Sequence, residues 1–163
     1  MTLVRPTASP AWLSASRISQ PRSGFGTVRT GLYGEKLTLE SLRSSGKPVM
    51  LLFTDPNYGP CTAMLPEIGR WQEERKEKVT ISLISRRTPE ENRAKSTEHG
   101  LQHVLLQEDW EVSEAYKVAG TPAALLVQSD DTISSPIMVG VEAIRTLLAH
   151  ALGERAQLPL MQP

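Results

Sequence analysis

Cysteine is nearly absent from the 163-residue sequence, in which Cys61 is the only one. A single cysteine cannot form a disulfide within the chain, and it excludes zinc sites that are built from several cysteines. The three histidines share no metal-ligand spacing; they are His99, His103 and His150. We therefore expect neither a metal site nor a cofactor.

The sequence also lacks an excess of charge and any long apolar run. Lys and Arg total 18 and Asp and Glu total 18, so the chain has no net field that would attract nucleic acid or an anionic membrane. No apolar stretch reaches the length of a membrane span or a secretory signal. We expect no nucleic-acid partner and no membrane span, and the oligomeric state is left open.

The N-terminal segment has no acidic residues, because the first one in the chain is Glu35. Residues 1–30 are rich in Arg, Ser and Thr, a composition typical of a disordered or targeting leader. The remaining length suits one domain, which we place at residues 31–153, followed by a tail at 154–163. We expect a cytoplasmic protein, and organellar targeting by the leader is the alternative.

Strands and helices alternate along the predicted domain. Residues 49–54, VMLLFT, form a continuous apolar run that predicts a strand buried on both faces. Hydrophobic spacing then predicts the order β-α-β-α-β-α-β-β-α. The expected segments are strand 49–54, helix 61–78, strand 79–85, a helix that begins after Thr88, strand 103–108, helix 109–120, strands 121–128 and 132–140, and helix 141–152.

Capping residues predict where two of these helices begin. Thr88, Pro89 and Glu91 have the pattern of an N-cap, a first-turn proline and the third residue of a capping box. For the helix at 109–120 we expect a cap at Asp109 and an end at Gly120. Trp71 and Trp110 lie at apolar helical positions, which predicts that both are core residues, whereas Trp12 lies in the leader.

The chemistry of the chain is concentrated between the first long strand and the following helix. The sequence there is Asp55-Pro56-Asn57-Tyr58-Gly59-Pro60-Cys61. Asp55 and Glu67 flank the turn without a partner base, so they are weak candidates for acid–base catalysis. For Arg86 and Arg87, a loop without a ligand is as compatible with the sequence as a binding role.

Two separated motifs resemble the thioredoxin superfamily, and most closely its TlpA-like and methylamine-utilisation-type members. They are KPVMLLFTDPNYGPCTAMLPEI and, some sixty residues later, VAGTPAALLV followed by a hairpin and a final helix. The resemblance covers about residues 31–153 and implies an α/β thioredoxin-like fold, with a mixed sheet flanked by helices. It also implies a cis bond between Thr121 and Pro122 beside the active site.

The resemblance assigns roles to the residues of the Tyr58-Gly59-Pro60-Cys61 turn. In the family, the position of Tyr58 holds the attacking cysteine, and Cys61 corresponds to the cysteine that resolves the mixed disulfide. Gly59, Pro60, Thr121 and Pro122 would shape the substrate site. Because two-cysteine exchange needs both sulfurs, the chain is expected to lack that activity on its own.

Four interpretations of Cys61 and of the function remain open from the sequence. Cys61 is a small buried hydrophobe, or it is the thiol of a one-cysteine redox protein, peroxiredoxin-like or linked to glutathione. The third is a non-catalytic domain that binds peptides or proteins in the groove beside Pro122. The fourth is a variant of an active parent in which the cysteine at position 58 has been replaced by tyrosine. The expected partners are proteins or peptides that carry thiols or disulfides.

Overall fold

A computed structural model of the chain describes residues 29–86 and 88–154. The predicted leader and tail lie almost entirely outside these residues, as do Trp12 and Arg87. The helices and strands described below fall within or directly next to the predicted domain at 31–153.

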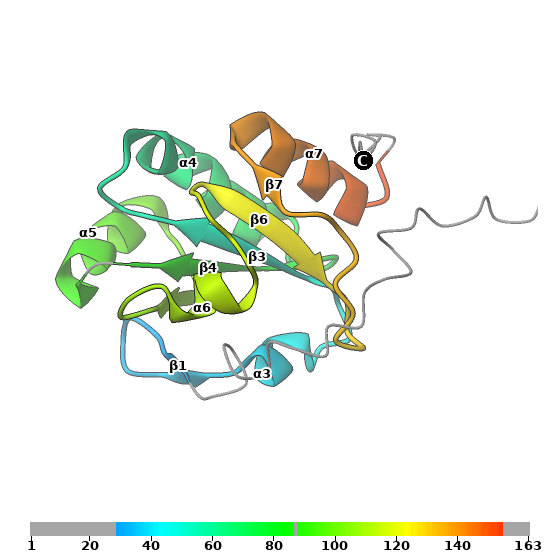
Figure 1. The fold of residues 1–163 in the computed structure, drawn as a ribbon, viewed down its shortest axis with the longest axis horizontal. Coiled ribbons are helices and arrows are strands. Elements are labelled where there is room, and N and C mark those ends of the chain that lie inside the picture. Colours follow the sequence, from blue (N-terminus) through cyan, green and yellow to red (C-terminus); the bar gives the residue numbers. More distant parts are fainter. Residues whose placement is uncertain (1–28, 87, 155–163) are drawn as a thin grey trace, which may run out of the picture.

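A mixed sheet of five strands forms the centre of the fold, in the order β5-β4-β3-β6-β7 (Figure 1). β3 (Val49–Thr54), β4 (Thr80–Ser85) and β5 (Val104–Leu106) are parallel to one another. β6 (Ala123–Val127) runs antiparallel to β3, and β7 (Met138–Val139) antiparallel to β6. The C-terminal ends of β3 and β4 therefore meet the N-terminal end of β6 at one end of the sheet, called the carboxyl end below.

Helices cover both faces of the sheet (Figure 1). α4 (Gly59–Glu74) and α7 (Val141–Ala151) pack on one face, while α3 (Leu39–Arg43) and α6 (Glu111–Ala115) pack on the other. α5 (Pro89–His99) lies beside α4. A short hairpin of β1 (Arg29–Thr30) and β2 (Lys36–Leu37) lies next to β5, which Gly31 contacts through an isolated bridge to Leu105.

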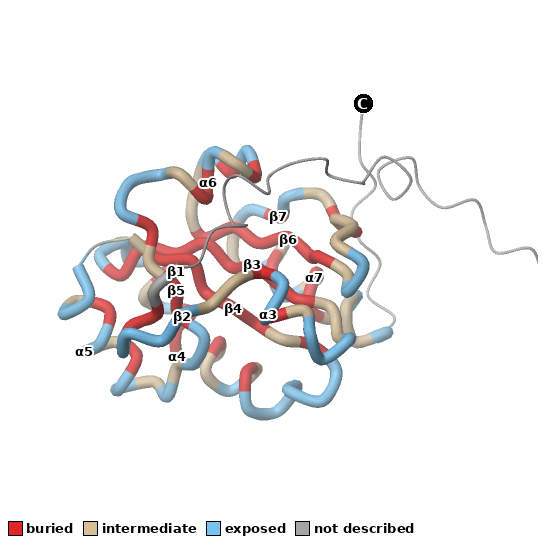
Figure 2. The backbone as a smooth tube through the Cα atoms, turned by 90° about the horizontal axis from the view of Figure 1, so that it is seen from below, coloured by how far each residue is buried: buried red, intermediate tan, exposed pale blue. Residues whose placement is uncertain are grey.

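The central position of β3 explains why its sequence is an apolar run. Met50 and Leu52 pack in the core beneath α4 and α7, while the alternate residues Val49, Leu51 and Phe53 pack in the core beneath α3 and α6. Successive side chains of a strand point to opposite faces, so a strand covered on both faces must be apolar at every position. All six residues of β3 are buried, and the tube in Figure 2 is red through the central strands.

The predicted order of elements is confirmed from β3 to α7. The capping box of α5 is confirmed as well: the Thr88 hydroxyl accepts the N–H of Glu91 at 3.3 Å, and the Glu91 carboxylate accepts the N–H of Thr88 at 3.0 Å. These features depend on residues close together in the sequence, so local patterns suffice to predict them.

The predicted limits of α6 are wrong. The helix begins at Glu111 with Trp110 as N-cap, and it ends at Ala115. Its N-terminal donors are satisfied by Gln107, whose Oε1 accepts the N–H groups of Val112 and Ser113, both at 3.1 Å. Lys117 adopts a left-handed conformation with φ of 60°, which ends the helix well before Gly120.

Replacing Gln107 by alanine should lower the free energy of unfolding by about 1–3 kcal/mol, because the buried helix donors of α6 would lose their acceptor. Asp109→Ala is the matched control and should change it by less than about 0.5 kcal/mol, since the Asp109 side chain caps nothing. Urea denaturation followed by circular dichroism measures both. A larger loss for Asp109→Ala than for Gln107→Ala would support the cap expected from the sequence.

The two described tryptophans differ in their surroundings. Trp71 is partly buried and packs against the core beneath α4 and α7, in line with the prediction. Trp110 is not a core residue: it is 38% exposed, and the Cζ atom of Arg86 lies 3.6 Å from its ring centroid. The apolar spacing at 109–120 is misleading because the helix there spans only five residues.

Candidate functional site

The loop between β3 and α4 is a tight turn organised by Asp55. Its Oδ1 accepts the backbone N–H of Asn57 at 2.9 Å, and its backbone carbonyl accepts the N–H of Tyr58 at 3.1 Å. Asp55 is itself buried. This local network fixes the direction in which α4 leaves the sheet.

A side-chain hydrogen bond to α5 also fixes this loop. The Asn57 side-chain amide donates to Oε1 of Glu91 at 2.9 Å, while Oε2 of Glu91 completes the α5 capping box with Thr88. One carboxylate therefore joins the start of α5 to the turn before Cys61. The capping pattern of the sequence predicts the role of Glu91 in α5, but no local pattern indicates its contact with this turn.

Tyr58 is the N-cap residue of α4, and its side chain makes no capping hydrogen bond. It is 49% exposed. Gly59 and Pro60 form the first helical positions and are exposed too, and Thr62 continues the helix by donating to the Tyr58 carbonyl at 3.0 Å. A large aromatic ring thus stands at the helix N-terminus, on the surface.

Cys61 lies in the first turn of α4 and is fully buried. Burial raises the pKa of its thiol, because a thiolate is poorly solvated there, and the negative charge of Asp55 adds to the rise. Hydrogen bonds with the Asp55 backbone and the Thr121 side chain oppose this rise without reversing it. Cys61 is therefore a protonated thiol near neutral pH.

Thr121 and Pro122 reach the site from β6. The peptide bond between them is cis, and the Pro122 carbonyl accepts the N–H of Gly140 at 2.9 Å. Pro122 is buried, and Thr121 contacts the sulfur of Cys61. The fold thus brings two motifs about sixty residues apart in the sequence to the carboxyl end of the sheet.

Glu67 does not belong to this site. Its carboxylate pairs with Arg145 of α7 at 2.9 Å, while the Asp55 carboxylate accepts a backbone N–H of its own turn. The two acids are therefore engaged separately. An acid–base pair of Asp55 and Glu67 gains no support from the geometry.

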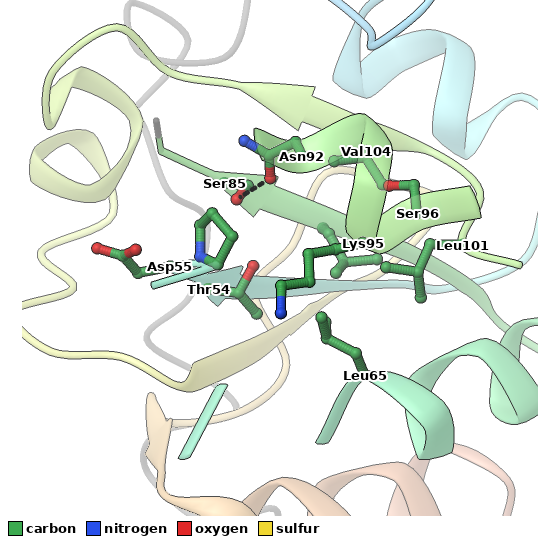
Figure 3. A pocket seen from close by; sticks show the side chains of 11 residues that line it. Thr54, Asp55, Leu65, Ser85, Asn92, Lys95, Ser96, Leu101 and Val104 are labelled. Carbon is green, nitrogen blue, oxygen red and sulfur yellow. Dashed lines mark hydrogen bonds between the residues drawn. The ribbon is translucent and has the colours of Figure 1, made fainter. Parts of the chain in front are cut away.

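A small apolar cleft lies behind the loop, between α4 and α5 (Figure 3). Leu65, Leu83 and Val104 are among its lining residues, as is Ser85, whose hydroxyl donates to Oδ1 of Asn92 at 2.6 Å. Cys61 does not line the cleft. The cleft therefore does not expose the sulfur.

Neither a metal cluster nor a membrane helix is found in residues 29–86 and 88–154. No group of three or more His, Cys, Asp or Glu side chains in this part of the chain is arranged to hold a metal ion. None of its helices combines the length and the apolarity needed to cross a bilayer.

Cys61 should react with a thiol reagent at least about a hundredfold more slowly in the native protein than in the unfolded chain. Because its pKa is raised, the native rate should keep increasing through about pH 9 without a plateau below neutral pH. The rate is measured by stopping the reaction at set times and determining the labelled fraction by mass spectrometry. Fast labelling near pH 6 would contradict burial and indicate a reactive thiolate.

Comparison with known proteins agrees with this geometry. A model of the AhpC/TSA family matches residues 25–135. Among curated protein sequences, none is significantly similar to the chain.

Solved structures establish the thioredoxin-like fold. A secreted Mycobacterium tuberculosis disulfide oxidoreductase, homologous to E. coli DsbE, is 22% identical with a TM-score of 0.62, over 78% of this chain and 94% of that one. The thioredoxin domain of a Bacteroides vulgatus thiol-disulfide oxidoreductase is 20% identical with a TM-score of 0.63, over 76% and 91%. An exposed lipoprotein thioredoxin of Streptococcus pneumoniae is 20% identical with a TM-score of 0.60, over 76% and 98%.

Proposed function

The chain belongs to the AhpC/TSA family, and we propose that it is a thioredoxin-like domain that binds protein clients and lacks two-cysteine exchange on its own. One observation carries this proposal: the exposed position at the start of α4 holds Tyr58, while the only cysteine of the chain is fully buried. The proposed ancestry is that of TlpA-like thiol–disulfide oxidoreductases, with a degenerate site.

The chemistry of exchange explains why the activity is expected to be missing. Reduction of a client begins when an exposed thiolate attacks one client sulfur, which forms a mixed disulfide and releases the other sulfur as a thiolate. A second enzyme cysteine then attacks the mixed disulfide, and the enzyme leaves oxidised. Tyr58 cannot make the first attack, and Cys61 has no second cysteine in the chain with which to form a disulfide.

Binding needs only the surface that surrounds the missing sulfur. Tyr58 offers an exposed ring, and Thr121 and Pro122 lie beside Cys61 at the N-terminal end of β6. Exposed aromatic side chains are frequent anchors of protein interfaces. Two of the three similar proteins named above are disulfide oxidoreductases, so clients with thiols or disulfides are the proposed partner class.

A second candidate function is one-cysteine redox chemistry at Cys61. It is favoured by the hydrogen bonds of the sulfur with Thr121 and the Asp55 backbone, both of which stabilise a thiolate. Burial opposes it, because peroxide and thiolate must meet. Stoichiometric sulfenic or sulfinic acid at Cys61 after treatment with hydrogen peroxide would favour this function over client binding.

Client binding is tested with reduced, carboxymethylated insulin chains, which are extended and have no free thiol. Tyr58→Ala should weaken their binding to the full chain by about tenfold, the usual cost of losing an aromatic anchor. Tyr33→Ala is the matched control, because Tyr33 is more exposed but lies in the β1–β2 turn, and it should have no effect. Calorimetry or fluorescence anisotropy measures the affinity, and equal effects of the two changes would contradict the proposed groove.

A further inference from the structure

Arg86 and Trp110 form a stacked pair at the carboxyl end of the sheet. The guanidinium carbon of Arg86 lies 3.6 Å from the centroid of the Trp110 ring. Arg86 directly follows β4, and Trp110 directly precedes α6. A guanidinium held over an indole ring gains cation–π attraction and has a fixed orientation.

Two buried networks fix the backbone on either side of this pair. The Arg86 carbonyl accepts the side-chain amide of Asn92 at 2.7 Å and lies 3.3 Å from the Ser85 hydroxyl. On the other side, Gln107 binds the first turn of α6, of which Trp110 is the N-cap. The position of the guanidinium is thus set before any ligand arrives.

The hydrogen-bonding capacity of Arg86 is not used by the described part of the fold. The guanidinium makes no ion pair or hydrogen bond with any residue of 29–86 or 88–154, and its Nε is buried without an acceptor. A guanidinium has five N–H donors, and buried donors are normally satisfied. An arginine that is oriented, partly buried and unpaired is suited to an external carboxylate, which it binds through two parallel hydrogen bonds.

Register places this pair beside the proposed client groove. Ser85 of β4 is the partner of Thr54 in β3, and Phe53 of β3 is the partner of Ala123 in β6. The start of β6 therefore lies two strand spacings from the end of β4, about 10 Å, which an extended peptide crosses in about three residues. A client held against the exposed Tyr58 and the partly exposed Thr121 can thus extend to Arg86.

We propose that the Arg86–Trp110 pair is a subsite for one acidic side chain of the client, about three residues from the client residue that contacts Thr121. This inference rests on the proposed function, since it names the class of client that the groove selects.

Neighbouring acids restrict the kind of anion. Glu108 and Asp109 are exposed in the loop that carries Trp110, and the Glu111 carboxylate accepts the N–H groups of both at 2.9 Å. Repulsion by these acids disfavours a doubly charged phosphate more than a single carboxylate. A carboxylate that binds bidentately to Arg86 is therefore the preferred ligand.

The test uses fluorescein-labelled decapeptides of Gly and Ser with one central Val, in which a single Glu or Gln is moved one to five residues from the Val. The full chain should bind the Glu peptide about tenfold more tightly than its Gln counterpart at one offset near three, as expected for charge-assisted hydrogen bonds. Arg86→Gln should abolish this preference and Arg86→Lys should reduce it. Arg70→Gln removes an equal charge from the exposed side of α4 and should keep the preference.

The outcomes separate this inference from the proposed function. If Tyr58→Ala weakens all peptides but Glu and Gln bind equally at every offset, the client groove stands and the acidic subsite is wrong. If no peptide binds, both are wrong. A phosphoserine peptide that binds about tenfold more tightly than the Glu peptide would overturn the choice of a carboxylate. Circular dichroism of each Arg86 variant verifies that it is folded.

Discussion

Tyr58→Cys is expected to convert the chain into a dithiol–disulfide exchange protein that reduces insulin with dithiothreitol at least about tenfold above background, whereas the parent chain stays at background. The other parts of the reaction are in place. Gly59 and Pro60 open α4, Cys61 follows in its first turn, and Thr121 contacts the Cys61 sulfur. The gain arises because a sulfur at position 58 would be exposed where Tyr58 is exposed now.

The helix N-terminus supplies the reactivity of the new cysteine. Tyr58 is the N-cap residue, and its side chain satisfies none of the free N–H groups of α4. These donors and the helix dipole stabilise a thiolate at that position and lower its pKa. The substitution removes a ring that is half exposed, so its cost in stability should be about 1 kcal/mol or less.

Two control variants isolate the role of the sulfur. Tyr58→Ser removes the same ring without adding a thiol and should leave insulin reduction at background. Incubated with an oxidised client in the absence of dithiothreitol, Tyr58→Cys combined with Cys61→Ala should trap mixed disulfides, since no second cysteine of the chain resolves them. If Tyr58→Cys forms the 58–61 disulfide and still fails to reduce insulin, the site differs from an exchange site by more than one residue. Turnover by the parent chain would show that a thiol outside it resolves Cys61.

Gly69→Ala should lower the free energy of unfolding by about 2 kcal/mol or more and reduce the melting temperature by roughly 5–15 °C. Helix propensity alone predicts the opposite, because alanine is favoured over glycine by about 1 kcal/mol inside a helix. However, a Cβ at Gly69 would overlap the His99 carbonyl oxygen and lie 3.3 Å from its carbon. That carbonyl is backbone at the end of α5, so α4 and α5 must separate.

Gly59→Ala is a matched control within the same helix. Apart from its chain neighbours and its own helix backbone, no atom of residues 29–86 or 88–154 lies within 4 Å of a Cβ at Gly59, and its backbone is not in the left-handed region. The change should therefore be neutral or stabilise the protein by up to about 1 kcal/mol. Thermal unfolding of both variants decides the matter: a Gly69→Ala protein as stable as the parent would mean that α5 does not approach α4 this closely.

Local sequence patterns predicted most of the framework of this protein. The apolar run at 49–54 required a strand covered on both faces, and Thr88, Pro89 and Glu91 predicted the start of α5. Resemblance to a known superfamily identified the two segments that meet at the site, which are the Tyr58–Cys61 turn and the Thr121–Pro122 pair. Each of these signals lies within a few consecutive residues, where chain geometry alone relates pattern to structure.

Only the tertiary structure decided which distant side chains complete those segments. Gln107 rather than Asp109 caps α6, and Glu91 accepts a hydrogen bond from Asn57. Arg86 stacks on Trp110, and the missing side chain of Gly69 lets the end of α5 pack closely against α4. It also decided that Cys61 is fully buried while Tyr58 is half exposed, although three residues separate them. These outcomes depend on how helices and strands pack after the chain has folded, and neither hydrophobic spacing nor capping preference contains that information.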